Sequence, residues 1–265
     1  MINFDDIEDP RIQIYRSLRY TPKIHTEQNV FVAEGEKVVV KLLKSNLTVE
    51  SIFATPEYYD RLEKLISIRN INSNFLFSAN KKLMEKIVGF SIHTGVMAIG
   101  KQPEYTDINN LHSPIIALNG VISSENVGSI VRNCAAFNFP SLIFDKGSSH
   151  PYLRRAVRVS MGNIFDLNIN KTENLKESLK LLKNNYNFKI FSAEINEKAV
   201  TITNYKFPRN MVLVFGNEGW GIDDEILSVS DEVIKIPINH NVASINVASS
   251  SAIFLFSIYS QLNSK

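Results

Sequence analysis

The sequence reads L-V-F-G-N-E-G-W-G-I over residues 213–222 and, after a short acidic segment, I-K-I-P-I-N-H-N-V-A-S-I-N-V-A-S over residues 234–249. Each segment begins as an apolar strand and ends in a polar loop. The first loop contains three glycines, and the second leads into a helix that we expect to begin at Ser244. Open α/β sheets bind ligands at the loops that follow the carboxyl ends of their strands. The stretch therefore predicts a ligand site made mostly of backbone groups, with one carboxylate, Glu218.

The C-terminal half of the chain alternates between apolar runs and helical patterns. We expect strands at 115–121, 141–145, 163–169, 188–193, 211–215 and 233–238, and helices at 126–138, 172–186 and 244–262. Strands that are apolar on both faces are typical of a parallel sheet with helices on either side. The sequence therefore predicts an α/β fold for residues 115–265, with a mostly parallel sheet and helices on both faces.

The helix expected at 126–138 carries an arginine away from its apolar face. The apolar positions recur at helical spacing and include the chain's one cysteine, which we expect to be buried rather than reactive: Val127, Ile130, Val131, Cys134 and Ala135. Arg132 lies off this face. An arginine near the carboxyl edge of a sheet suits a phosphate or a ribose hydroxyl. An ordinary surface arginine fits the spacing equally well, so the spacing leaves both interpretations open.

The first hundred residues predict a small α/β domain of their own. Strands are expected at 30–33, 49–54, 75–77 and 95–99, and helices at 10–20, 36–43, 56–66 and 80–87. His25 and His93 are isolated, which favours structural or loop roles over metal ligation. Residues 101–114 are polar and contain prolines near both ends, a composition typical of a linker. We therefore expect domains at 1–100 and 115–265, joined by a linker at 101–114.

Length and composition exclude several classes of protein. A chain of 265 residues with one cysteine forms no internal disulfide, which favours the reducing cytoplasm. The acidic N-terminus is unlike a signal peptide, and the apolar run at 252–256 is too short to span a membrane. The ligand stretch holds no metal cluster. We therefore expect a cytoplasmic protein with no membrane segment and no metal.

The formal net charge of +2 is small, but its distribution is uneven. Basic residues gather in two places: Arg11, Arg16, Arg19 and Lys23 near the start of the chain, and Arg154, Arg155 and Arg158 later. Such clusters bind phosphate groups of nucleic acids. Solvated helix faces explain either cluster alone about as well.

The last helix is apolar on almost every side. Its apolar residues include Phe254, Leu255, Phe256 and Ile258, which point in several directions around the helix. A terminal helix that packs on one sheet should keep one wet face. We therefore expect a second copy of the chain to cover the remainder, with the helix at 126–138 alongside.

Four motifs, taken in order, resemble the SpoU (TrmH-like) branch of the SPOUT RNA methyltransferases. They are N-V-G-S-I-V-R at 126–132, R-V-S-M-G at 158–162, G-N-E-G-W-G at 216–221, and I-P-I at 236–238 followed by S-I-N-V at 244–247. The first hundred residues are similar to the small ribosomal-protein-like RNA-binding domain of several ribosomal RNA members. The segments F-V-A-E-G at 31–35 and H-T-G-V at 93–96 carry this weaker likeness.

The resemblance implies a trefoil-knotted sheet, S-adenosylmethionine as cofactor, and a homodimer with the site near its interface. It implies catalytic roles for Arg132, Asn126, Glu218, Ser244 and Asn246. Cofactor contacts are expected from Ala193, Gly216, Gly219, Ile236, Ile238 and Ile245. RNA contacts are expected from Arg11, Arg16, Arg19, Lys23, Arg154 and Arg155.

The implied reaction is attack of a ribose 2′-hydroxyl on an activated methyl group, in ribosomal RNA rather than transfer RNA. In this scheme Arg132 orients and activates the hydroxyl, while Asn126 and Asn246 hold the arginine or the ribose. Glu218 bonds the arginine or loop amides, and Ser244 either contacts substrate or caps its helix. Two alternatives belong to other classes: a nucleotide-binding dehydrogenase, and a non-catalytic RNA-binding protein of the same fold. The dehydrogenase is disfavoured because its G-x-G-x-x-G fingerprint opens a long helix in the first βα unit.

Overall fold

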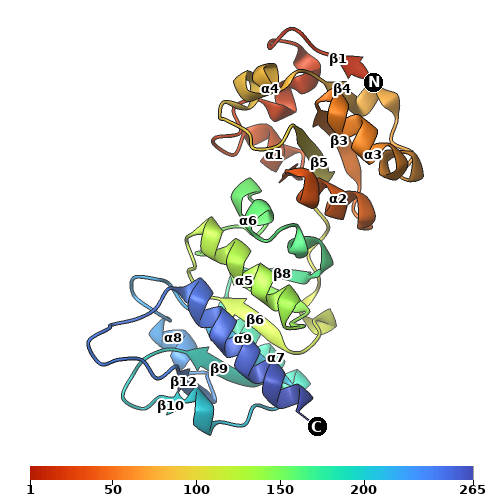
Figure 1. Cartoon of the computed structure of the whole chain (residues 1–265). Coiled ribbons are helices and arrows are strands. Elements are labelled where there is room, and N and C mark those ends of the chain that lie inside the picture. Colours follow the sequence, from red (N-terminus) through yellow and green to blue (C-terminus); the bar gives the residue numbers. More distant parts are fainter. Residues whose placement is uncertain (265) are drawn as a thin grey trace. The chain divides into compact units, whose positions relative to one another are not determined.

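A computed structural model describes residues 1–264, which form two compact units. The first unit contains Met1–Pro103 together with Tyr152–Phe165, and the second contains Glu104–Pro151 and the chain after Phe165 (Figure 1). Residues 152–165 thus pack with the first unit, a grouping that a division along the chain does not anticipate. The linker composition at 101–114 falls mostly within the second unit, where the Thr106 amide donates to the Ile169 carbonyl at 2.7 Å.

The first unit is built on a five-stranded mixed sheet in the order β1-β4-β3-β5-β2. Its strands are β1 (Ile2–Asn3), β2 (Val30–Glu34), β3 (Val49–Ala54), β4 (Leu76–Ser78) and β5 (Val96–Lys101). β5 runs antiparallel to both of its neighbours, β2 and β3, while β1, β4 and β3 are parallel. The helices are α1 (Lys23–Glu27), α2 (Glu36–Lys44), α3 (Pro56–Ile68), α4 (Lys81–Val88) and α6 (Arg154–Val159), with 3-10 turns at Pro10–Tyr15 and Ser73–Phe75.

Local sequence explains several of these helices. α2 and α4 each bury one apolar face and leave lysines in solvent. Asn80 caps α4 as its sequence predicts, because its side chain accepts from the Leu83 amide at 2.9 Å. The helix expected over residues 10–20 is instead a 3-10 turn that ends at Tyr15, whose ring is fully buried. His25 is buried, with its Nε2 2.7 Å from the Ile14 carbonyl oxygen, which fits the expected structural role.

The second unit is built on a seven-stranded sheet in the order β10-β12-β9-β11-β6-β7-β8, with every neighbouring pair parallel. Its strands are β6 (Ile115–Leu118), β7 (Ser141–Asp145), β8 (Asn168–Thr172), β9 (Lys189–Ala193), β10 (Val200–Thr201), β11 (Met211–Phe215) and β12 (Glu232–Lys235). The helices are α5 (Ser124–Ala136), α7 (Leu175–Tyr186), α8 (Asp224–Leu227) and α9 (Val247–Asn263), with 3-10 turns at Ile108–Asn110 and Ile202–Asn204. The predicted α/β class and mostly parallel sheet are confirmed.

Alternate residues of the central strand face different helices. Val212 and Val214 join the apolar core that contains the buried face of α7. Phe215 points to the other face, where its ring meets that of Phe254 on α9 at 5.8 Å between centroids. A strand that is buried on both faces must be apolar throughout, and all five residues of β11 are buried.

Helices α5 and α9 pack side by side on one face of the sheet (Figure 1). The Asn133 amide on α5 donates to the Ala248 carbonyl (3.1 Å) and to the Ser251 hydroxyl (2.8 Å) on α9. Cys134 is fully buried, and burial raises the pKa of its thiol, so it is inert as predicted. Ala135, expected on the same apolar face, is exposed.

Three element boundaries differ from the sequence prediction because of local hydrogen bonding. The strand expected at 163–169 is a 3-10 turn (Asn163–Asp166) followed by β8. Asn174, not Thr172, caps α7 through the Glu177 amide, and Thr172 belongs to β8. α9 begins at Val247 rather than Ser244, because the Asn246 side chain caps the helix by accepting from the amides of residues 248 and 249.

The expected interface residues on α9 also need correction. Phe254, Leu255 and Ile258 are 1%, 0% and 0% exposed, so the chain covers them itself. Phe256 is 59% exposed, and Ile253 and Tyr259 are exposed beside it. The apolar residues that could meet a second chain are therefore these three and not the four first named.

Neither a membrane-spanning helix nor a metal-binding cluster is found over residues 1–264. No helix there has the length and hydropathy that crossing a bilayer requires. The same residues bring together no group of three or more histidine, cysteine or acidic side chains with metal-binding geometry.

Adjacent leucines on α7 test this packing. We expect Leu182→Ala to lower the free energy of unfolding by about 2–5 kcal/mol, because Leu182 is 1% exposed in the core against β11. Leu181→Ala is the matched control and should change stability by less than about 1 kcal/mol, because Leu181 is 37% exposed. Urea unfolding followed by circular dichroism measures both, and equal losses for the two variants would contradict the assigned helix face.

Candidate functional site

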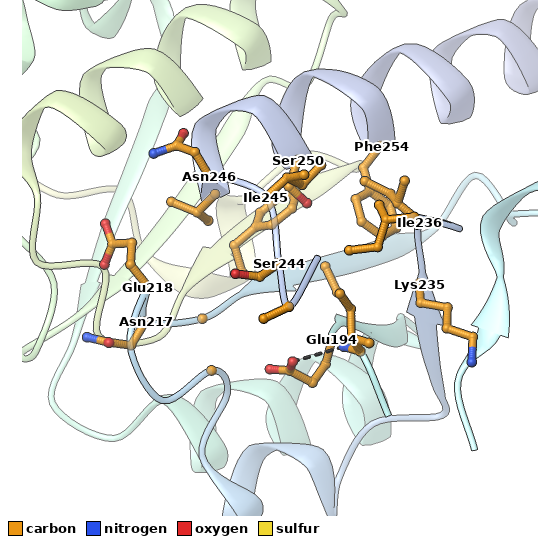
Figure 2. A pocket seen from close by; sticks show the side chains of 18 of the residues that line it. Glu194, Asn217, Glu218, Lys235, Ile236, Ser244, Ile245, Asn246, Ser250 and Phe254 are labelled. Carbon is orange, nitrogen blue, oxygen red and sulfur yellow. Dashed lines mark hydrogen bonds between the residues drawn. The ribbon is translucent and has the colours of Figure 1, made fainter. Parts of the chain in front are cut away.

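A cavity of about 410 Å³ opens at the carboxyl ends of β9, β11 and β12 (Figure 2). Pockets for small molecules are typically of this size. The loops after these three strands and the start of α9 form its walls, and Phe254 lies beside Ile236 in the lining (Figure 2). The structure brings together nine residues that the sequence predicts for the site: Ala193, Gly216, Glu218, Gly219, Ile236, Ile238, Ser244, Ile245 and Asn246.

The glycine-rich loop after β11 is closed by its own backbone. The Asn217 amide donates to the Gly221 carbonyl at 2.9 Å, and the Gly221 amide returns a bond to Asn217 at 3.0 Å. A Cβ on Gly216 would lie 2.5 Å from the Gly221 carbonyl carbon, so only glycine fits there. Gly221 adopts a φ of +78°, which favours glycine as well. The loop therefore has one compact shape that leaves room for a ligand.

The side chain of Asn217 connects this loop to the loop that follows the neighbouring strand, β6. Its Nδ2 donates to the Gly120 carbonyl at 2.7 Å, and its Oδ1 accepts from the Gly219 amide at 2.7 Å. Asn217 is buried, so both bonds are shielded from water. Sequence reasoning named the glycines of the motif and missed this asparagine, although asparagine in a turn commonly hydrogen-bonds the nearby backbone.

A second polar network lies beneath the loops. Asn119, directly after β6, donates to both Asp145 (3.1 Å) and Asp223 (2.9 Å), and its Oδ1 accepts from the Asp223 amide. Asp145 in turn accepts from the Gly120 amide at 3.1 Å. These residues come from the ends of β6 and β7 and from the start of α8, so no local pattern in the sequence could have grouped them.

Glu194 contributes a carboxylate to the cavity wall. Its Oε2 accepts from the Ile222 amide at 3.0 Å and its Oε1 from the Ile195 amide at 2.9 Å. Figure 2 shows this side chain below Ser244, on the opposite side of the cavity from Asn246. The residue directly follows β9, so its place in the sequence was the available signal. The lysine of the wall, Lys235, donates to the Asn196 carbonyl at 3.2 Å.

Three of the predicted catalytic residues form one hydrogen-bonded chain at the mouth of the cavity. The Asn246 Nδ2 donates to the Asn126 Oδ1 at 3.1 Å, and the Asn126 Nδ2 donates to the Glu218 Oε1 at 2.5 Å. The chain links the start of α9, the start of α5 and the glycine loop. Ser244 lines the cavity but caps no helix, so a capping role for it is wrong.

The structure does not bring Arg132 to this cavity within one chain. Arg132 lies six residues after Asn126 on α5, about 9 Å further along the helix axis. It is exposed, and it makes no hydrogen bond or ion pair with any other residue in the range 1–264. Its guanidinium is therefore available to a group from outside the chain.

The basic residues of the first unit differ in how they are engaged. Arg11 pairs with Asp9 at 2.6 Å, and Arg16 pairs with Glu8 at 3.0 Å. Arg154 pairs with buried Glu34 and lies 4.3 Å from the ring centre of Phe90. The remaining three predicted RNA contacts, Arg19, Lys23 and Arg155, are exposed, and Arg155 also has an interaction partner within the chain.

The side chains that line the cavity suit an uncharged or cationic nucleoside with apolar surface better than a nucleotide. Ile236, Ile238, Ile245 and Phe254 supply apolar surface for a flat base, and the Glu194 carboxylate can accept from sugar hydroxyls. A phosphate would meet Glu194 and Glu218. The loop also opens only the four-residue α8, which carries Asp224 and Glu225 in its first turn. These observations disfavour a dehydrogenase, and they fit S-adenosylmethionine.

The fold and the cavity thus define an α/β protein that binds a nucleoside-like cofactor at its strand ends. The SpoU rRNA methylase family matches residues 113–256, more than half of the chain, so the chain belongs to this family. It is an S-adenosylmethionine-dependent RNA methyltransferase.

Individual relatives cover nearly the whole chain. An uncharacterised tRNA/rRNA methyltransferase of Mycobacterium bovis is 26% identical over 95% of this chain and 89% of its own length. The 23S rRNA (guanosine-2′-O-)-methyltransferase RlmB of Acinetobacter baylyi is 25% identical over 88% of this chain and 93% of its own length. The AdoMet-bound rRNA methyltransferase from Sinorhizobium meliloti has the same fold, with a TM-score of 0.84, 20% identity and 99% of both chains covered.

Two glycines of the loop test its role in cofactor binding. We expect Gly216→Ala to weaken S-adenosylmethionine binding about tenfold or more, because the new methyl group overlaps the Gly221 backbone and must displace the loop. Gly219→Ala is the control, since its Cβ would lie 3.3 Å from the Asn217 Oδ1 and needs only a small shift. Isothermal titration calorimetry measures both affinities, and an unchanged affinity for Gly216→Ala would show that the loop does not shape the cofactor site.

Proposed function

We propose that the protein methylates a ribose 2′-hydroxyl of ribosomal RNA in the cytoplasm. The observation that carries the proposal is the Asn246–Asn126–Glu218 chain at the mouth of the cofactor cavity, where neutral and anionic groups can hold a hydroxyl in one orientation. The likeness to a 23S rRNA 2′-O-methyltransferase over most of both chains supports the ribose as acceptor and ribosomal RNA as substrate. Transfer RNA is the alternative substrate.

The cofactor supplies a methyl group that is already activated on a sulfonium, so the protein's task is alignment and control of charge. The apolar wall formed by Ile236, Ile238 and Ile245 would hold the base, and the loop from Gly216 to Gly219 would hold the cofactor through its backbone. Glu194 is suited to sugar hydroxyls. Asn126 and Asn246 would orient the acceptor ribose, and Ser244 faces the same space.

A homodimer across α5 and α9 completes the proposed site. Ile253, Phe256 and Tyr259 are exposed on α9, and the ring of Phe137, at the end of α5, lies 5.9 Å from that of Phe256. Arg132 is exposed on α5. A second chain packed on this face would therefore place the loops of its site against Arg132 of the first chain. There Arg132 would bind an RNA phosphate and position the 2′-hydroxyl.

The first unit is proposed to capture RNA for the catalytic unit. Arg19 and Lys23 are exposed and suited to phosphates, whereas Arg11, Arg16 and Arg154 already pair with carboxylates and Arg155 also interacts within the chain. A trefoil knot in the catalytic unit is also part of the proposal. It is supported by the return of residues 236–246 from β12 to α9, which packs against α5 beyond the glycine loop.

The function is tested with labelled S-adenosylmethionine and RNA from a strain that lacks the gene. We expect wild-type protein to transfer the methyl group to ribosomal RNA, with primer extension showing a 2′-O-methyl stop. Arg132→Ala should lose about a hundredfold or more of the rate with unchanged cofactor affinity, because it removes a positioning cation only. Lys180→Ala, which removes an exposed charge on α7, is the control. Transfer to transfer RNA alone, or to a base atom, would refute the proposal.

The dimer is tested by one charge on its proposed face. We expect wild-type protein to sediment as a dimer and Phe256→Glu to sediment as a folded monomer, because burying Phe256 at an interface is worth about 1.5–3 kcal/mol and a buried glutamate reverses this. Phe75→Glu, at a similarly exposed phenylalanine of the first unit, should remain a dimer. A monomeric wild type would disprove the interface.

A further inference from the structure

Large apolar side chains are exposed on the loops that follow four neighbouring strands of the catalytic sheet. Ile122 follows β6, Ile195 follows β9, Trp220 follows β11 and Val242 follows β12. They are 56%, 45%, 71% and 46% exposed. Because these strands are adjacent and parallel, all four loops lie along one edge of the sheet. Two of the four residues, Ile195 and Trp220, also line the cofactor cavity.

Trp220 is the most exposed of the four and is held on a rigid support. It lies inside the loop closed by the two bonds between Asn217 and Gly221, and its own amide donates to the Asn217 Oδ1 at 3.3 Å. The residue two positions earlier, Glu218, belongs to the polar chain proposed to orient the acceptor ribose. An indole that is 71% exposed on a fixed loop beside a reaction site leaves a large apolar surface for a ligand to cover.

The charged side chains of these four loops are mostly acidic. The four loops carry Glu194, Glu197, Glu218 and Asp223, against one lysine, Lys198. These loops by themselves attract a phosphate weakly, so apart from the proposed contact with Arg132 across the dimer, RNA must gain affinity here from contacts that do not depend on its charge. Stacking of a base on an aromatic ring is a contact of that kind.

We propose that Trp220 stacks on an unpaired nucleobase of the RNA, at or next to the nucleotide that is methylated. The inference rests on the proposed function and adds a substrate class to it, namely an unstacked nucleotide in a loop or bulge. A base inside a duplex has both faces covered by its neighbours, whereas an extruded base can lie on the indole. Stacking tolerates every base, so Trp220 selects for an unpaired nucleotide and leaves its identity to other contacts.

Phe256, the exposed phenylalanine of the surface assigned to the dimer, lies far along α9 from the loop that carries Trp220. Phe256 is ten residues after Asn246 on α9, about 15 Å along the helix axis, whereas Asn246 connects to the glycine loop through Asn126 and Glu218.

The test uses the intrinsic fluorescence of the full-length protein, because Trp220 is the chain's one tryptophan. A short single-stranded RNA of mixed sequence should quench it strongly, and the same strand annealed to its complement should quench it weakly. We expect Trp220→Ala to bind the single strand about tenfold more weakly, the effect of losing one stacked base, and to raise the KM for ribosomal RNA measured at saturating S-adenosylmethionine. Trp220→Phe should restore most of this binding. Tyr186→Ala, which removes an exposed ring on α7, should behave as wild type.

Three results would overturn the inference. They are quenching by S-adenosylmethionine alone but not by RNA, equal quenching by single strand and duplex, and an unchanged KM for Trp220→Ala. In each case wild-type transfer to ribosomal RNA would still stand, so loss of the stacking role is distinguishable from loss of the proposed function. Absence of any transfer by wild type refutes the function itself.

Discussion

The hydrogen bond from the Asn217 side chain to the Gly120 carbonyl connects the loops of two adjacent strands, and the candidate site depends on it. A parallel sheet places every strand end at one edge, but it does not by itself hold the following loops in a common shape. Here the buried side chain of Asn217 donates to the loop after β6 and accepts from its own glycine loop. The side chain of Asn119 likewise connects separate segments of the chain, because it donates to both Asp145 and Asp223. Buried, satisfied polar groups of this kind are strong because no water competes for them, and leaving one unsatisfied costs about 1–3 kcal/mol.

The sequence predicted the elements whose signals are local. The apolar run of β11, the helical repeat of α5 and the glycines of the loop each depend on neighbours within one turn or one strand, and each was found. Helix starts were less certain, because Ser244 and Asn246 are both good caps and only the hydrogen bonds of Asn246 decide between them. The residues of the cavity wall were found largely through the family resemblance. Glu194, Asn217 and Asn119 were missed, because their partners are brought in by the sheet from distant parts of the chain.

The apolar residues of α9 show why composition alone does not identify the residues of an interface. Its four candidate interface residues were grouped because one sheet was thought to cover only one side of a helix. In the fold α9 lies beside α5 as well as over the sheet, and Phe254 also reaches the cavity. Two surfaces and a cavity together bury Phe254, Leu255 and Ile258, and only the stripe that contains Ile253, Phe256 and Tyr259 is left in solvent.

Helix α9 thereby couples three parts of the proposed mechanism through rigid geometry. Its N-cap, Asn246, belongs to the polar chain at the acceptor position; Phe254, two turns on, lines the cofactor cavity; and Phe256 lies on the opposite side in the proposed interface. A helix moves as a unit, because its backbone bonds run the length of the axis. A displacement of α9 at the interface is therefore transmitted both to the cofactor wall and to the group that orients the ribose. If the proposed dimer forms through α9, this coupling gives a physical reason for its formation to affect the cofactor cavity.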